Sequence, residues 1–193
     1  MRLQYVLNEY AHRYAEKWDA MAQTKDTAHK FAETYINPEP KLKPDQQYSD
    51  QLEYCLATSA ETINQRLRRD DITDIDKKII DCISHYHTKR PLILYRGIPT
   101  ELLHDMTENA AQLNTKNVHL YDKGFMCCSL VKSHELAGQT KLRIYVPENS
   151  SCIYQGGINF EPELFEVDIM AGAKLQILSI DPEYINVKLI STF

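Results

Sequence analysis

The sequence predicts an α+β protein, with helices in the first half of the chain and short strands in the second half. Apolar residues recur every three or four positions up to about residue 90, which is the period of an amphipathic helix. After residue 90 the chain changes to short apolar runs separated by turn residues, which is typical of strands. The 193 residues contain no internal repeat, and helices followed by strands indicate one α+β domain.

The helical half begins with an apolar stripe that we expect to pack into the core. Its members are Val6, Tyr10, Tyr14, Trp18 and Met21, and after a break Ala28, Phe31, Ala32, Tyr35 and Ile36 continue the period. The segment 37–50 contains three prolines and is predicted to be a connecting loop, because proline disrupts a helix interior.

Two further helices are predicted before residue 90. The first begins near Ser49, a residue type that favours the N-cap position, and is expected to turn Leu52, Cys55, Leu56, Ser59, Ile63 and Leu67 inward. The second begins at Thr73, which has the spacing of a capping box with Asp76. Its inward residues are expected to be Ile75, Ile79, Ile80, Ile83 and Tyr86.

The second half is predicted to open with a buried strand at 92–95 and a helix at 100–113. Further short strands are predicted at 118–121, 125–131, 142–146, 152–154, 165–170, 174–180 and 184–190. Turn-forming residues such as Asn149-Ser150 and Asp181-Pro182 separate several of them.

Composition and charge exclude several classes of protein. A net charge of −5 argues against nucleic acid as a partner, and no apolar stretch approaches the roughly 20 residues of a membrane span. The N-terminus lacks the apolar run of a signal peptide, and five cysteines without framework spacing predict free thiols in a reducing, cytoplasmic compartment. No CxxC motif occurs, and His85 and His87 would point to different faces of a helix, so no metal site is expected.

Three short segments carry residues that could do chemistry. Leu94–Ile98 places Arg96 at the end of a buried strand, where its fork could bind a phosphate or pair with a structural carboxylate. Gly124–Ser129 ends in three small side chains, which leave room for a ligand or for another strand. Glu166 stands at the mouth of an apolar strand, where it could stabilise a cation or be a solvated loop acid.

Taken together, in this order and spacing, these segments resemble the arginine–serine–glutamate type of mono-ADP-ribosyltransferase found among bacterial toxins. The family pattern is an aromatic-Arg-Gly strand, then Gly-Phe-x-Ser-Thr-Ser, a strand ending in proline, and Glu-x-Glu at the head of a further strand. This sequence offers Tyr95-Arg96-Gly97, Gly124-Phe125-Met126-Cys127-Cys128-Ser129, Leu142–Pro147 and Leu164-Phe165-Glu166-Val167. The resemblance implies one domain over 1–193, with a split β-sheet core at 45–193 and a helical N-terminal extension at 1–44.

The resemblance implies NAD as the co-substrate and assigns roles to matching residues. Arg96 would bind the NAD phosphates, and Gly97 would offer backbone groups to the nicotinamide amide. Glu166 would stabilise the oxocarbenium ion as nicotinamide leaves, just as a carboxylate in a glycosidase stabilises a positively charged sugar. Arg96 and Glu166 would therefore contact opposite ends of one dinucleotide.

Other roles follow from the same resemblance. Phe125 matches the aromatic residue before the serine motif and would contact NAD, as would Cys127 and Ser129. The segment 130–138 would close over nicotinamide, and the segment 155–163 would face the acceptor.

Two departures from the family pattern alter these expectations. Cys127-Cys128 replaces Ser-Thr, and because a thiol is a poorer hydrogen-bond donor, Cys127 would orient the glutamate weakly while Ser129 contributes. Leu164 stands where arginine-modifying enzymes carry Glu and asparagine-modifying toxins carry Gln, so arginine is not the expected acceptor. Glu163 is the neighbouring acceptor-facing candidate.

The expected function is transfer of ADP-ribose from NAD to a protein side chain other than arginine, by a monomeric bacterial effector or toxin exported without a signal peptide. Three alternatives remain open. Leu164 favours an NAD glycohydrolase, with water as the acceptor. The Cys127-Cys128 replacement favours a binding module that has lost catalysis. The third alternative is an unrelated α+β domain with coincidental motif matches.

Overall fold

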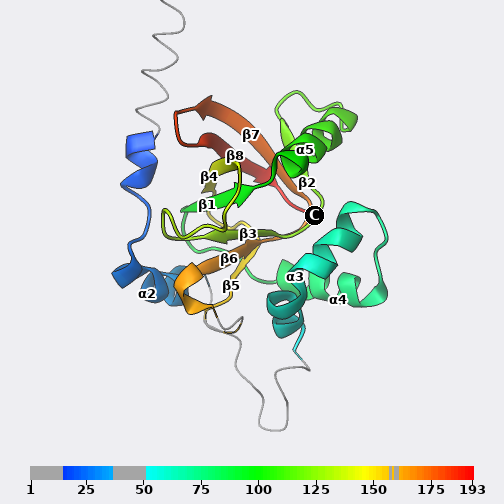
Figure 1. Cartoon of the computed structure of the whole chain (residues 1–193). Coiled ribbons are helices and arrows are strands. Elements are labelled where there is room, and N and C mark those ends of the chain that lie inside the picture. Colours follow the sequence, from blue (N-terminus) through cyan, green and yellow to red (C-terminus); the bar gives the residue numbers. More distant parts are fainter. Residues whose placement is uncertain (1–14, 37–50, 157, 159–160) are drawn as a thin grey trace, which may run out of the picture.

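The structure is a computed structural model that describes residues 15–36, 51–156, 158 and 161–193, and it confirms the α+β class. Figure 1 shows the sheet at the centre of the molecule, with α2 near one end of it and α3 and α4 packed together at another. The helices are α2 (Lys25–Tyr35), α3 (Leu52–Arg68), α4 (Asp74–Ser84) and α5 (Thr100–Gln112), and residues 15–19 form one more helical turn. No helix in these ranges is both long enough and apolar enough to cross a bilayer.

The start of α4 agrees with the sequence. Thr73 is the N-cap, its hydroxyl accepts from the Asp76 backbone N–H, and the Asp76 carboxylate accepts from the Thr73 backbone N–H at 2.9 Å. Asp76 is also bound by Arg66 of α3, with Nε 2.8 Å from Oδ2. The capping box therefore also ties the two helices together.

Three side chains that were expected to face the core are exposed. Met21 is 39 % exposed, because residues 20–24 form a turn that interrupts the helical period. Ser59 is exposed at a kink in α3, where its backbone leaves the helical region. Ile75 is 44 % exposed because the neighbouring Asp76 takes the inward position, and adjacent helical residues point about 100° apart. The predictions for Val6, Tyr10, Tyr14, Ser49 and the loop 37–50 lie outside the described residues.

Each predicted strand is present, with ends that differ by a few residues. The strands are β1 (Leu92–Ile98), β2 (Leu120–Asp122), β3 (Met126–Ser129), β4 (Thr140–Val146), β5 (Cys152–Tyr154), β6 (Glu166–Ile169), β7 (Ala173–Ile180) and β8 (Ile185–Ser191). They form one mixed sheet in the order β2-β7-β8-β4-β1-β3-β6-β5, in which β4 and β8 are parallel and all other pairs are antiparallel.

The sheet narrows at the junction of β1 and β3, which gives the predicted split core. β1 pairs with β4 along its whole length, from Leu92 to Ile98, but with β3 only where Tyr95 lies opposite Ser129. The end of β1 therefore separates from β3. This separation matters because Gly97 and Cys127, which would pair if the ladder continued, both line a cleft instead.

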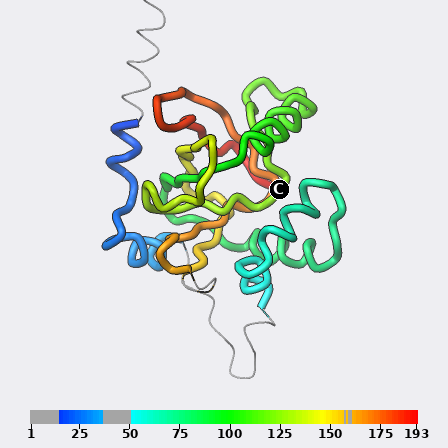
Figure 2. The backbone as a smooth tube through the Cα atoms, in the orientation of Figure 1, coloured from blue at the N-terminus to red at the C-terminus, as the bar shows by residue number. Residues whose placement is uncertain are grey.

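Residues 15–36 pack on the side of the sheet away from α3 and α4, as the blue and cyan parts of Figure 2 show. Trp18 is 5 % exposed and stacks on Tyr145, with ring centroids 5.7 Å apart. Asp19 accepts hydrogen bonds from Tyr95 at 2.9 Å and from Lys132 at 3.1 Å, and its carboxylate lies 2.8 Å from Arg143 Nε. This segment thus joins strands β1 and β4 from outside.

Candidate active site

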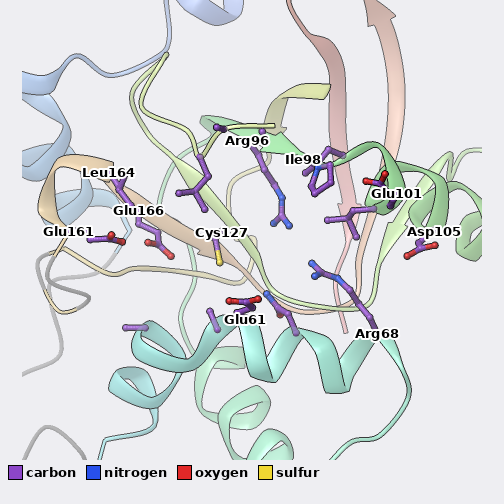
Figure 3. A pocket seen from close by; sticks show the side chains of 18 of the residues that line it. Glu61, Arg68, Arg96, Ile98, Glu101, Asp105, Cys127, Glu161, Leu164 and Glu166 are labelled. Carbon is purple, nitrogen blue, oxygen red and sulfur yellow. The ribbon is translucent and has the colours of Figure 1, made fainter. Parts of the chain in front are cut away.

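A cleft of about 990 Å³ lies between α3 and the strands where the sheet separates. Its walls come from α3, the end of β1 and start of α5, β3, the loop at 136–137 and the turn before β6. Arg96 and Glu166 both line it, although they are seventy positions apart in the sequence. In Figure 3 the Arg96 and Arg68 side chains point into this space, and Glu166 lies at its other end beyond Cys127. The two residues expected to contact opposite ends of one ligand therefore share one cavity.

Arg96 is held in the cleft by a buried acid. Its side chain is 8 % exposed, and Nη2 lies 3.4 Å from Oδ2 of Asp122. Burial opposes the charge, but Asp122 and other acidic neighbours raise the pKa of the Arg96 guanidinium above its usual value. Nη1 is buried and has no hydrogen-bond partner among the residues that the structure describes. The structural pairing expected as one alternative is thus present, and it leaves one N–H group of this cleft residue unused.

Arg68 is a cleft residue that the sequence did not single out. It extends from α3 and binds Asp122 through a bidentate pair, Nε to Oδ1 at 2.9 Å and Nη2 to Oδ2 at 3.0 Å. One buried carboxylate therefore holds two guanidinium groups in the same cavity. Such a pair suits the two negative charges of a diphosphate. In the sequence Arg68 is one of three arginines at 66–69, and only its partner distinguishes it.

Glu166 stands at the first position of β6, half-buried, and belongs to a cluster of three groups. Ligand atoms of Glu166, Cys127 and Asp168 all lie within 4.8 Å of one another. Glu166 and Asp168 are two positions apart on one strand, so their side chains lie on the same face of the sheet. Asp168 also lies opposite Cys127 on β3, which brings the three side chains together. Asp168 is fully buried, and Gln155 donates to its Oδ2 at 2.6 Å. Sequence patterns missed Asp168, since an acid within an apolar strand resembles a surface position.

This cluster has the ligand types of a zinc site, but the Arg96 guanidinium beside it opposes the binding of a cation. Burial and the two carboxyl groups raise the pKa of the Cys127 thiol well above its usual value, so the thiol keeps its proton and can donate a hydrogen bond. The Arg96 charge also acts on Cys127 and Asp168. We therefore assign these groups to hydrogen bonding.

Ser129 contributes to the site through backbone contacts. It does not line the main cleft but a small recess beside it, and its hydroxyl donates to the Leu164 carbonyl at 2.7 Å. The same oxygen accepts from the Val131 backbone N–H at 3.1 Å. The hydroxyl thus fixes the turn that precedes Glu166.

Phe125 does not line the cleft, in contrast to its expected contact with NAD. It is fully buried in the apolar cluster under α3 and α4, because its neighbours there are Leu56 and Ile63. The Asn64 side chain binds its backbone on both sides, with Nδ2 3.0 Å from O and Oδ1 2.7 Å from N. Phe125 therefore supports the α3 wall from behind.

Gly97 lines the cleft and lies against the loop that follows β3. A Cβ atom at Gly97 would overlap the Leu136 carbonyl oxygen, and one at Gly138 would overlap the backbone of Ile98. Leu136 and Ala137 form cleft wall at this point. Two glycines thus bring this loop against β1, at the position expected to cover nicotinamide.

The acceptor-facing residues divide into two groups. Leu164 and Glu161 line the cleft near Glu166, whereas Glu163 does not. Residues Pro162–Leu164 form a 3-10 turn, so strand alternation does not apply to Glu163, whose carbonyl lies 2.8 Å from Nδ1 of His134. Gln155, expected at the start of the acceptor loop, is instead buried against Asp168. Residues 157, 159 and 160 of that loop lie outside the described part.

Many solved structures share this fold, and three of them are bacterial proteins of similar architecture. C3stau2 from S. aureus, solved with NAD, has a TM-score of 0.64 and 17 % identity, covering 88 % of this chain and 97 % of its own. The C3 exoenzyme of Clostridium limosum has a TM-score of 0.55 and 20 % identity, covering 94 % of each chain. The ADP-ribosylating toxin BECa of C. perfringens, solved with NADH, has a TM-score of 0.58 and 16 % identity, covering 86 % of this chain and 47 % of its own. No curated protein sequence matches.

The fold is therefore that of bacterial ADP-ribosyltransferase toxins, two of which were solved with NAD or NADH. A family model narrows this further. It is described as ADP-ribosyltransferase exoenzyme, and it matches residues 15–190. The chain belongs to that family.

Proposed function

We propose that this protein cleaves the nicotinamide–ribose bond of NAD and transfers ADP-ribose to a side chain of another protein. The observation that supports this most directly is that Arg96 and Glu166 line one cleft. The volume of about 990 Å³ is sufficient for a dinucleotide, because ligand pockets of this kind span about 300–1,000 Å³. Membership of the ADP-ribosyltransferase exoenzyme family supports NAD as the dinucleotide that binds there.

The two guanidinium groups bind the diphosphate. Arg96 and Arg68 are oriented by the same Asp122 carboxylate, so little side-chain entropy is lost when a ligand arrives. The Gly97 backbone and the loop at 136–137, which also line the cleft, hold nicotinamide. The ribose that joins these parts then lies beside Glu166.

The reaction breaks the bond between ribose C1′ and the nicotinamide nitrogen. Nicotinamide leaves with the electron pair and becomes neutral, while positive charge develops on the ribose. The Glu166 carboxylate stabilises that charge, as it would in a glycosidase. The acceptor atom then forms a bond to C1′ and gives up its proton.

The acceptor is a side chain other than arginine. Leu164 occupies the wall beside Glu166, and an apolar side chain can neither hydrogen-bond a guanidinium nor remove its proton. The protein acts as a monomeric secreted toxin or effector, a role that family membership supports.

A substitution of Glu166 tests this function. We expect Glu166→Gln to lower nicotinamide release by about 10²-fold or more, because a neutral amide cannot stabilise a developing cation. The melting temperature should stay within a few degrees, since Glu166 is half-buried at a strand end. Glu148→Gln, an exposed acid outside the cleft, should retain the parent rate. Release by Glu166→Gln at the parent rate would exclude the proposed role.

NAD hydrolysis is the second candidate, and Leu164 is the observation that favours it, because the usual acceptor-positioning residue is missing. The two activities differ in where ADP-ribose goes. Mass spectrometry of candidate target proteins after incubation with NAD separates them. Added ADP-ribose mass on a target supports transfer, whereas nicotinamide release without any added mass supports hydrolysis.

A further inference from the structure

A buried carboxyl group lies beside the proposed catalytic glutamate and has no role in the reaction described above. Asp168 is fully buried on β6, two positions after Glu166, and carboxyl oxygens of the two residues lie within 4.8 Å of each other. Residues two apart on a strand share a face, so both carboxyl groups are on the same side of the sheet. A second acid at this distance must affect the first.

Asp168 is anchored on one side. Gln155 Nε2 donates to Oδ2 at 2.6 Å, and Gln155 is itself fully buried. Oδ1, the other carboxyl oxygen, is buried and has no hydrogen-bond partner of ordinary geometry in the part of the chain that the structure describes. Gln155 thus fixes the Asp168 side chain and leaves one oxygen for its neighbours in the cluster, Glu166 and Cys127.

The residue at position 127 explains why a second hydrogen-bond donor would be useful beside Glu166. Its position matches the family serine that orients the catalytic glutamate, and an S–H group is a weak donor. A carboxyl O–H is a much stronger donor, and an O–H···O⁻ bond to an ionised carboxylate is short and strong. Asp168 can therefore do for Glu166 what the thiol does poorly.

We propose that Asp168, anchored by Gln155, is a positioning residue that orients the Glu166 carboxylate through a hydrogen bond shared by the two acids. This inference rests on the proposed function of Glu166. Two carboxylates in a buried place cannot both be charged without strong repulsion, so the pair retains one proton. Burial favours that proton on Asp168 over the half-buried Glu166, and it outweighs the hydrogen bonds with Cys127, Gln155 and Glu166, which lower the pKa of Asp168.

The surroundings of Asp168 determine how the pair titrates. Burial raises the pKa of the Asp168 carboxyl, and the neighbouring side chains and the Arg96 charge oppose that shift. The titratable and charged groups that face it are Arg96 from β1, Cys127 and Cys128 from β3, Cys152 from β5 and Glu166 on its own strand. When the pH rises above the pKa of Asp168, its carboxyl group loses the proton that it donates to Glu166, and the two carboxylates then repel each other. The rate of nicotinamide release should therefore fall as the pH becomes alkaline.

The first test follows the carboxyl groups directly and requires no activity. In the full chain with ¹³C-labelled carboxyls, NMR should show Asp168 and Glu166 titrating as a coupled pair. Asp168→Asn should shift the Glu166 midpoint by at least half a pH unit, and the exposed Asp74→Asn should leave it unchanged. A Glu166 midpoint that is the same in Asp168→Asn and in the parent would overturn the inference.

The second test measures nicotinamide release between pH 6 and 9. Asp168→Asn keeps a neutral donor at every pH, so it should retain the parent kcat within about threefold at pH 7 and lose the alkaline fall. Asp168→Leu should lower kcat at least tenfold with KM nearly unchanged, and adding Cys127→Ser should recover at least threefold. A parent alkaline fall that persists unchanged in Asp168→Asn would refute the inference, and this readout holds even if Asp168→Leu does not fold.

The two proposals fail separately. A parent protein that folds and releases no nicotinamide from NAD contradicts the proposed function. The Glu166 titration then decides the inference by itself, since coupling between the two carboxyl groups does not depend on turnover.

Discussion

Single residues shape the cleft in two ways: a missing side chain lets two backbone segments approach, and paired side chains hold each other in position. Gly97 is the clearest case, because its missing side chain lets the Leu136 carbonyl of the following loop lie against β1. Its backbone is extended, so the space next to it, not its torsion angle, requires glycine. Arg68, Arg96 and Asp122 show the complementary effect, in which side chains fix each other in place.

A methyl group at Gly97 should therefore displace the loop and leave the sheet intact. We expect Gly97→Ala to raise the KM for NAD, or to lower nicotinamide release, by about tenfold, because misplacement of a binding wall by about 1 Å costs about that much or more. Steady-state kinetics with NAD measures the effect.

The control for this variant lies in the same loop. Gln139→Ala removes an exposed side chain one residue beyond Gly138 and should keep parent kinetics. If Gly97→Ala also kept parent kinetics, the close approach of loop and strand would have no part in NAD binding.

At the scale of elements, α3 forms one wall of the cleft and is held by contacts on both sides. On one side Asn64 binds the Phe125 backbone, and on the other Arg66 binds Asp76 of α4. Arg68, at the end of the same helix, lines the cleft. The position of Arg68 thus depends on Phe125 and Asp76, which do not line the cleft.

Removal of the link between the helices should destabilise the protein. Asp76 accepts from Arg66 and from the Thr73 cap, so Asp76→Ala leaves Arg66 and the cap without their partner and should lower the free energy of unfolding by about 3 kcal/mol. Asp74, two residues earlier, is 91 % exposed in its pair with Lys77, and Asp74→Ala should cost less than about 0.5 kcal/mol. Urea denaturation measures both values, and equal effects would contradict the assigned link.

The same pair predicts a pH dependence. The hydrogen bond from Arg66 outweighs burial and lowers the pKa of Asp76 to about 2. Because this value lies below that of an unfolded aspartate, about 3.9, the stabilisation is complete above roughly pH 5 and is lost as pH falls toward 2. The free energy of unfolding of Asp76→Asn should therefore fall less steeply between pH 5 and pH 2 than that of the parent. Parallel curves would show that Asp76 is not a source of the acid sensitivity.

At the scale of the whole molecule, residues 15–36 pack against the sheet and do not line the cleft. Trp18 and Asp19 join β1 and β4 from outside, and Ala28, Ala32 and Ile36 of α2 enter the main core. The sequence predicts one domain over 1–193 that includes a helical N-terminal extension at 1–44, and these contacts support that prediction. We propose that this segment folds with the core as one domain.

This proposal predicts a large effect for one residue and a small one for its neighbour. Trp18→Ala should lower the free energy of unfolding by about 3 kcal/mol in a single cooperative transition, because it leaves a cavity under Tyr145. Met21→Ala, which removes a side chain that is 39 % exposed, should cost less than about 1 kcal/mol. Urea denaturation followed by fluorescence and by circular dichroism tests this, and two separate transitions would support an independent extension.

Much of the fold could be predicted from the sequence because its signals are local. The helical period, the Thr73 capping box and the short apolar strands each depend on neighbours within a few residues, and all are present in the structure. The failures were local too: Ser59 and Ile75 are exposed, because a kink and a buried acid changed which side of the helix faces inward.

The sequence by itself determined the fold class and placed an arginine and a glutamate that share one cleft. Only the tertiary structure decided their partners: Asp122 holds Arg96 and Arg68, Asp168 lies beside Glu166, and Phe125 faces the core. The physical reason is that a buried charge is tolerated only beside a partner, and partners come from strands and helices that are distant in the sequence. Which of these segments meet depends on how the sheet separates at β1 and β3, and no local pattern records that.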